Sequence, residues 1–176
     1  MSPPTTDHTL LPDAEAQCIA LAEMLKPAIG EDAAFVGIFS GGVWVAERVA
    51  TLLGLTTPVG QIDVSFYRDD YEKIGLHPNV RPTSIPFPVE GRHIILFDDV
   101  LESGRTTRAA LNVLFDFGRP ACVDMAVLAD RGGRQLPIAA RWQVWAPTTS
   151  RSDALILERS PADKLTWRMA RRERMA

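Results

Sequence analysis

The sequence lacks the features that mark membrane and secreted proteins. In its 176 residues, no apolar run approaches the roughly 20 residues that a membrane helix needs. Residues 1–13 have neither a basic region nor an apolar core, so they do not resemble a secretory signal. The only two cysteines, Cys18 and Cys122, lie far apart in apolar stretches, and a metal site needs more ligands than that. We therefore predict two buried, reduced thiols in a cytoplasmic protein without a membrane segment.

Positive charge is scarce over most of the chain. The formal net charge is −3, and residues 1–150 carry 12 basic against 18 acidic side chains. Residues 151–176 reverse this balance with 7 basic and 4 acidic side chains. Most of the molecule is therefore a poor electrostatic surface for nucleic acid. We divide the chain into a main domain over 1–150, with an N-terminal helix, and a C-terminal strand and basic tail over 151–176.

The apolar pattern predicts an α/β fold. Its clearest unit is a continuous apolar run over 92–97, a turn over 98–104, a helix over 106–117 and a strand over 122–128. Strand, helix and strand at these lengths form a crossover, so the sheet is expected to be mainly parallel and flanked by helices. The elements expected before this unit are a helix over 13–26, a strand over 34–39, a helix over 43–53, a strand over 58–67 and a long loop over 68–88.

The turn that follows the clearest strand carries the chemistry. In a parallel sheet, ligands bind where strands end and helix N–H groups point outward. Ser103, Thr106 and Thr107 offer hydroxyls there, and Gly104 allows a close backbone turn, but the lysine of a nucleotide-triphosphate loop is absent. An adjacent acidic pair, Asp98-Asp99, would repel a phosphate unless it served sugar hydroxyls or a divalent cation. A monophosphate carried on a ribose satisfies both features.

The segment from Ile94 to Thr106 resembles the 5-phosphoribosyl-1-diphosphate (PRPP) motif of type I phosphoribosyltransferases. The resemblance narrows to the PyrR family in other segments, covering about residues 35–150. These segments are Phe66-Tyr67-Arg68-Asp69-Asp70, Thr83-Ser84-Ile85-Pro86, Phe117-Gly118-Arg119-Pro120 and Ala126-Val127-Leu128-Ala129-Asp130-Arg131-Gly132. The resemblance to this family implies the type I phosphoribosyltransferase fold, with a small hood and a mobile loop. The implied reaction is a Mg²⁺-dependent transfer of ribose 5-phosphate from PRPP to uracil, giving UMP and pyrophosphate, together with a role in pyrimidine regulation.

The resemblance assigns roles position by position. Asp98 and Asp99 match the pair that holds the ribose hydroxyls and lies near the metal, and the segment Ser103-Gly104-Arg105-Thr106-Thr107 matches the 5′-phosphate cradle. Arg68, Asp69 and Asp70 match the mobile loop that closes over PRPP and excludes water. Asp130 and Arg134 match hood positions near the base and pyrophosphate, where a guanidinium would stabilise the leaving group.

The sequence departs from the family pattern in three places, one of which is the pair Glu102 and Gly133, where the family commonly has an aromatic residue and a histidine. The other two are stretches at the expected site. The pyrophosphate loop, usually Thr-Arg-Gly, is Ser40-Gly41-Gly42 here, so a glycine replaces the arginine. In the base pocket, Val144-Trp145-Ala146 replaces Gly-Lys-Asn, and uracil could stack on Trp145 or Trp145 could fill its place. Two further hypotheses stay open: a UMP- or PRPP-sensing regulator with little or no turnover, and a transferase for a different base.

Two kinds of partner follow from the resemblance. Family members form dimers or larger assemblies, so a homodimer or larger homo-oligomer is expected. The family's RNA face is basic, whereas the first helix here carries Asp13, Glu15 and Glu23 against Lys26. RNA binding would instead use basic residues near the C-terminal end, with Trp167 available for base stacking. These residues are Lys164, Arg168, Arg171, Arg172 and Arg174.

Overall fold

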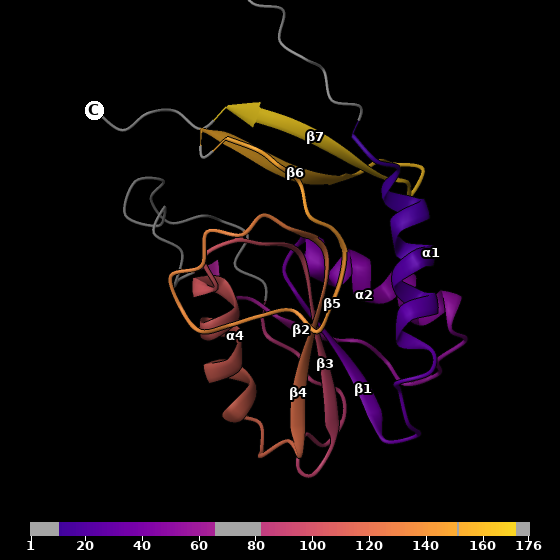
Figure 1. Cartoon of the computed structure of the whole chain (residues 1–176). Coiled ribbons are helices and arrows are strands. Elements are labelled where there is room, and N and C mark those ends of the chain that lie inside the picture. The colour runs from indigo at the N-terminus through magenta and orange to yellow at the C-terminus, as the bar shows by residue number, and fades with distance from the viewer. Residues whose placement is uncertain (1–10, 66–81, 151, 172–176) are drawn as a thin grey trace, which may run out of the picture.

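A computed structural model describes residues 11–65, 82–150 and 152–171, and its centre is a five-stranded parallel sheet (Figure 1). The strand order is β2-β1-β3-β4-β5. The strands of this sheet are β1 (Ala33–Ile38), β2 (Gly60–Ile62), β3 (His93–Leu101), β4 (Cys122–Asp130) and β5 (Trp142–Trp145). The helices are α1 (Ala14–Leu25), α2 (Gly41–Leu52) and α4 (Arg105–Phe115). The predicted α/β fold, with a parallel sheet flanked by helices, is confirmed.

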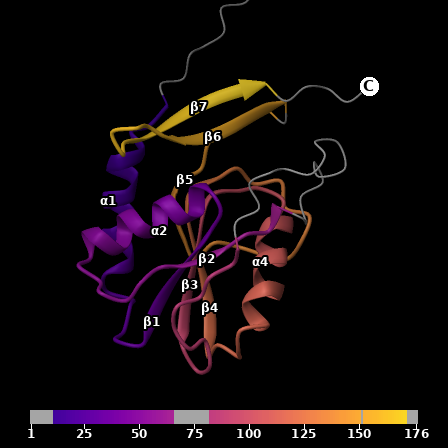
Figure 2. The ribbon, with the colours of Figure 1, turned by 180° about the vertical axis from the view of Figure 1, so that it is seen from behind.

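Helices α1 and α2 cover one face of the sheet and α4 covers the other (Figures 1 and 2). Strand β3 serves both faces because consecutive side chains of a strand point to opposite sides. Ile95 and Phe97 pack with α1 and α2, whereas Ile94 and Leu96 pack with α4. All four are fully buried, which explains the continuous apolar run in this part of the sequence.

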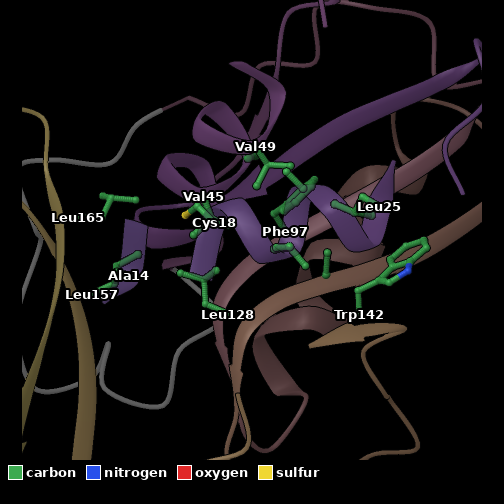
Figure 3. Close-up of a cluster of buried hydrophobic side chains, with 14 of the residues drawn as sticks. Ala14, Cys18, Leu25, Val45, Val49, Phe97, Leu128, Trp142, Leu157 and Leu165 are labelled. Carbon is green, nitrogen blue, oxygen red and sulfur yellow. The ribbon is translucent and has the colours of Figure 1, made fainter. Parts of the chain in front are cut away.

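Helix α1 begins at a side-chain cap, and one of its faces packs in the core. The Asp13 carboxylate accepts hydrogen bonds from the backbone N–H groups of Glu15 and Ala16, so donors that the first helical turn leaves free are satisfied. Figure 3 shows side chains of α1, such as Cys18 and Leu25, gathered with Phe97 of the sheet. This helix therefore carries the packing surface that joins the N-terminal part of the chain to the sheet.

The end of β3 differs from the predicted turn. The strand continues through Asp98 and Asp99 to Leu101, because Val100 and Leu101 still pair with Ala129 and Asp130 of β4. Ladder hydrogen bonds thus override the polar side chains that made 98–104 resemble a turn. The other difference is β2, which has only three residues within the predicted range of 58–67, whose last two positions lie outside the described residues.

The C-terminal segment forms a hairpin instead of a single strand. Strands β6 (Asp153–Arg159) and β7 (Leu165–Arg171) pair antiparallel and lie beside the N-terminal end of α1 (Figure 1). Trp167 is only 9% exposed, and its Nε1–H donates to Gln17 Oε1 at 2.6 Å. The expectation that Trp167 is available for stacking on RNA is therefore wrong, because its ring packs in the core.

The two cysteines have different environments. Cys18 is buried, and its burial, followed by the nearby Glu15 carboxylate, raises the pKa of its thiol to about 12. Cys122 is exposed, so the prediction of two buried thiols is wrong for this residue. The physical reason is its place as the first residue of β4, at the end of the sheet.

Within 11–65, 82–150 and 152–171, no helix is both long and apolar enough to cross a lipid bilayer.

Candidate active site

A cavity of about 430 Å³ lies where the carboxyl ends of β1 and β3 meet the first turns of α2 and α4. Its size is that of a pocket for a small molecule, and its position is the ligand site expected of a parallel α/β sheet. Seventeen residues line it: Phe39, Ser40, Gly41, Trp44, Asp98, Asp99, Val100, Leu101, Glu102, Ser103, Gly104, Thr106, Thr107, Arg131, Leu155, Ile156 and Leu157. The structure thus brings the predicted acidic pair, phosphate cradle and pyrophosphate loop to one cavity.

The acidic pair is held by the backbone of β3. Asp98 is 8% exposed, and its Oδ1 accepts the backbone N–H of Asp99 at 3.0 Å. Asp99 is half-buried and lies against the start of α2. Because strand pairing continues on both sides of the pair, the positions of these two carboxylates are fixed by the sheet and not by a loop.

The segment from Glu102 to Thr107 joins β3 to α4 through a left-handed glycine. Gly104 has φ of 88°, which an L side chain rarely adopts, so the tight turn requires glycine. Ser103 Oγ accepts the N–H of Arg105, while the buried Thr107 hydroxyl donates to Met125 Sδ. Thr107 therefore anchors the first turn of α4 to β4, and Thr106 is the threonine with its hydroxyl in a half-buried position at the cavity.

A second segment, residues 131–138, binds the connection between β3 and α4. Three backbone carbonyls of the cradle accept hydrogen bonds from it: Leu101 O from Arg131 N–H, Glu102 O from the Arg134 guanidinium and Ser103 O from Gln135 N–H. Gln135 also accepts the Nε–H of Arg105 through its side chain at 2.7 Å. The Arg105 side chain is therefore directed toward this second segment, although Arg105 belongs to the matched cradle segment.

Arg134 lies within this second segment. Its guanidinium donates to the Asp130 carboxylate, to Ile138 O at 2.7 Å and to Glu102 O at 2.7 Å. Asp130 in turn accepts the N–H of Gly132. The structure thus gives both predicted hood residues a positioning role beside the cradle, and a direct contact of either one with pyrophosphate or base stays a prediction.

The Ser40-Gly41-Gly42 loop packs directly against the end of β3. A Cβ atom on Gly42 would lie 2.3 Å from Phe97 O, and one on Gly41 would lie 2.5 Å from the Asp99 carboxylate. The peptide bond between Phe39 and Ser40 is cis. This close approach is the physical reason for two glycines: the first turn of α2 reaches the acidic pair only when neither residue has a side chain.

The remaining predicted residues lie elsewhere. Arg68, Asp69 and Asp70 fall outside the described residues. Val144 and Trp145 lie in β5, partly buried against the main core, and the Trp145 ring packs on Trp167 with centroids 6.2 Å apart. Neither belongs to the cavity lining, so the structure favours packing for Trp145 over stacking with a base.

Sequence reasoning missed three parts of the cavity. Arg131 lines it with a side chain only 4% exposed, held by Thr149 Oγ1, Ser150 O and the Glu102 carboxylate. The sequence did carry a signal for Arg131, because this residue directly follows a buried strand, where ligand sites of parallel sheets lie. Trp44 of α2 and the β6 residues from Leu155 to Leu157 complete the wall. Their contribution had no local signal, because it depends on a hairpin from the far end of the chain.

Comparison with known proteins agrees with this geometry. The phosphoribosyl transferase domain model matches residues 11–150. The bifunctional protein PyrR of Pseudomonas fluorescens is 55% identical over 117 residues, which are 66% of this chain and 69% of that protein. The bifunctional protein PyrR of Pseudomonas aeruginosa is 59% identical over 104 residues, which are 59% of this chain and 61% of that protein. The matches to these two curated relatives thus cover roughly two thirds of their length.

Solved structures share the fold at lower identity. A hypoxanthine phosphoribosyltransferase from Staphylococcus aureus superposes with a TM-score of 0.60 at 19% identity, covering 82% of this chain and 80% of that one. A purine phosphoribosyltransferase from Pyrococcus horikoshii gives a TM-score of 0.58 at 22% identity, covering 76% and 82%. From the matched domain and the high identity to the PyrR proteins, the chain belongs to the PyrR family of type I phosphoribosyltransferases.

Proposed function

We propose that the cavity binds PRPP and transfers its ribose 5-phosphate group to uracil, giving UMP and pyrophosphate. The observation that carries this proposal is the convergence of Asp98 and Asp99, the Gly104 turn and the first turn of α2 on one cavity. A phosphorylated sugar needs acceptors for its hydroxyls and donors for its phosphate, and the two sets lie side by side here. The uracil specificity follows from membership of the PyrR family.

The cradle and the acidic pair divide the work of binding. The N–H groups of the first turn of α4, with the hydroxyls of Ser103 and Thr106, hold the 5′-phosphate, because a helix N-terminus favours an anion. The carboxylates of Asp98 and Asp99 accept hydrogen bonds from the ribose hydroxyls. Charge-assisted hydrogen bonds of this kind contribute about 1.5–3 kcal/mol each.

The same carboxylates suit a divalent cation. Mg²⁺ prefers oxygen ligands and often reaches a protein through one or two carboxylates and the phosphates of its substrate. Asp98 and Asp99 offer such oxygens at the cavity wall, so they fit this ion. These two carboxylates would hold the ion, which would supply positive charge to offset part of the negative charge of pyrophosphate.

The leaving group is stabilised without the arginine that the family carries in the pyrophosphate loop. Gly41, the first residue of α2, brings its N–H to the cavity, and the Ser40 hydroxyl is available there. Arg131 brings a buried guanidinium to the same cavity. These groups take up the negative charge that develops on pyrophosphate, because preformed donors in a closed site stabilise such charge strongly.

A transfer assay with Mg-PRPP and a panel of bases tests the proposal. UMP formed from uracil at an ordinary enzymatic rate, and faster than nucleotides from other bases, is the expected result. A preference for another base would overturn the uracil assignment and keep the transferase. Absence of product, with PRPP or UMP still raising the melting temperature, would instead identify a nucleotide-sensing regulator.

A further inference from the structure

A second group of metal-ligating side chains lies at the opposite end of the sheet. His93 is the first residue of β3, and Cys122 and Asp124 lie at the start of β4. The ligand atoms of all three lie within 4.8 Å of one another, and His93 Nε2 is 2.8 Å from Asp124 Oδ2. This His–Cys–Asp cluster is separate from the cavity, because the five residue steps from His93 to Asp98 span roughly 17 Å of strand.

Strand register brings the three side chains to one face. His93 is paired with Cys122 across the two parallel strands, and Asp124 follows Cys122 by two residues, so all three point to the same side of the sheet. The three side chains differ in their exposure to solvent. His93 and Asp124 are largely buried, whereas Cys122 is exposed. An ion can therefore enter from the thiol side and meet ligands that the sheet holds in place.

The charges around the cluster also favour a cation. The Asp124 carboxylate brings negative charge to the ligand atoms, and the other partner of this carboxylate is Arg141. Arg141 Nη1 lies 2.7 Å from Asp124 Oδ2, but its side chain is 57% exposed and its guanidinium also lies over the Trp142 ring at 4.8 Å. The guanidinium can stay on the indole when the carboxylate turns to another partner.

We propose that His93, Cys122 and Asp124 form a binding site for a borderline-soft divalent metal of the Zn²⁺ class. Imidazole nitrogen, thiolate sulfur and carboxylate oxygen are the ligands that zinc takes in proteins, whereas Mg²⁺ prefers an all-oxygen site. A tetrahedral zinc ion needs ligand atoms roughly 3.5 Å apart, so the thiol moves inward and the His–Asp contact opens slightly. Binding releases the thiol proton to solvent and leaves the remaining imidazole proton on Nδ1, while the fourth position holds water.

The site joins the first residues of two central strands. A metal that binds the folded chain and not the unfolded chain raises the stability of the fold. We therefore expect Zn²⁺ to raise the melting temperature, and this effect does not depend on the proposed transfer reaction.

Titration of the tag-free full chain with Co²⁺ tests the site, because a cobalt–thiolate bond gives a near-ultraviolet charge-transfer band. One equivalent of Co²⁺ is expected to saturate the band, and Zn²⁺ is expected to displace it while Mg²⁺ does not. Cys122→Ser should abolish the band, and His93→Gln or Asp124→Asn should weaken binding by about 100-fold or more. The matched control is Cys18→Ala, which removes the other thiol and should leave the band unchanged.

A second measurement uses the unmodified chain, so it tests the site even if the variants fail to fold. Saturating Zn²⁺ should slow alkylation of Cys122 by about tenfold or more, as read by peptide mapping. Equal alkylation with and without Zn²⁺, or a cobalt band that persists in Cys122→Ser, would overturn the proposal. A band lost in the Asp98→Asn/Asp99→Asn double variant would also overturn it, because the metal would then belong to the cavity.

Discussion

The phosphate cradle and the C-terminal hairpin line the same cavity but are held in place in opposite ways. The cradle belongs to one continuous β3–α4 unit, and its supports are strand pairing with β4 and three backbone carbonyls bound by residues 131–138. The hairpin is attached by side chains across long sequence separations. Glu15 accepts the N–H of Leu165, Gln17 accepts the indole N–H of Trp167, and Arg48 binds Asp163.

Because of this difference, the groups that bind the substrate and the groups that cover the cavity depend on different contacts. Groups proposed to bind the phosphate and ribose lie on backbone that the sheet fixes, so their geometry survives changes elsewhere. The groups that cover the cavity, Leu155 to Leu157, lie on an element that packs on α1 and α2 through one apolar patch and a few polar bonds. Changes in the cradle should therefore abolish function without unfolding the chain, and changes under the hairpin should do the reverse.

The largest effect is expected from the Asp98→Asn/Asp99→Asn double variant. Loss of two charge-assisted acceptors should weaken PRPP binding by about 10²–10⁴-fold, with the melting temperature nearly unchanged. Calorimetric titration with PRPP measures the affinity. Asp116→Asn, at the exposed end of α4, is the matched control and should bind normally; an unchanged affinity in the double variant would refute the site assignment.

The second test compares the two glycines of the pyrophosphate loop. In Gly42→Ala, the new Cβ meets backbone atoms of Phe97 and Asp98, so β3 or α2 must move, and both stability and kcat/KM should fall, the latter by about 10²-fold. In Gly41→Ala, it meets the Asp99 side chain, including its Cβ at 2.9 Å, so Asp99 is displaced, and activity should fall with a smaller loss of stability than in Gly42→Ala. Equal melting temperatures for the two variants would contradict this division.

The third test removes the hairpin's main anchor. Trp167→Ala should lower the free energy of unfolding by about 3–5 kcal/mol, because a large buried side chain leaves a cavity and Gln17 loses its partner. PRPP affinity of the folded fraction should change less than the KM for the base. Denaturant unfolding and steady-state kinetics measure the two quantities, and Thr166→Ala, on the exposed neighbouring position, is the control. Equal losses for PRPP and base would show that the hairpin and the cradle act as one unit.

The smallest effect is expected at Arg48, which binds Glu15 of α1 and Asp163 of the hairpin turn. These ion pairs are partly exposed, so Arg48→Met should cost about 0.5–1 kcal/mol in unfolding free energy, and the cost should shrink at high salt. A loss above 2 kcal/mol, roughly twice that of an exposed pair, would mean that charge and not apolar packing holds the hairpin.

The sequence predicted the β3–α4–β4 unit well and the C-terminal hairpin poorly. The β3–α4–β4 unit was predictable because its apolar periodicity, its glycine turn and its acidic pair are all local in the sequence. Gly41 and Gly42 were recognised as part of a loop that lacks the arginine. The close contact with β3 that requires glycine there could not be predicted, because β3 is more than 50 residues away in the sequence. Trp167 was assigned to solvent because its neighbours are basic; its burial depends on Gln17, 150 residues away.

The docking of β7 on α1 places the start of the last described strand beside the first helix (Figure 1), and this bears on how the protein is made. The cradle is complete once residues up to about 138 have been synthesised, whereas the wall formed by β6 waits for the last strand to pair with it. A chain stopped near residue 152 loses the core contacts of Leu157, Leu165 and Trp167, so it should be less stable than the full chain, and its folded fraction should hold PRPP in an open groove. Hydrogen exchange in β3 and α4 measures how much of the cradle stays ordered. The hairpin thus completes the wall of the cavity after the cradle has formed, so the pocket is enclosed only when β6 and β7 have paired.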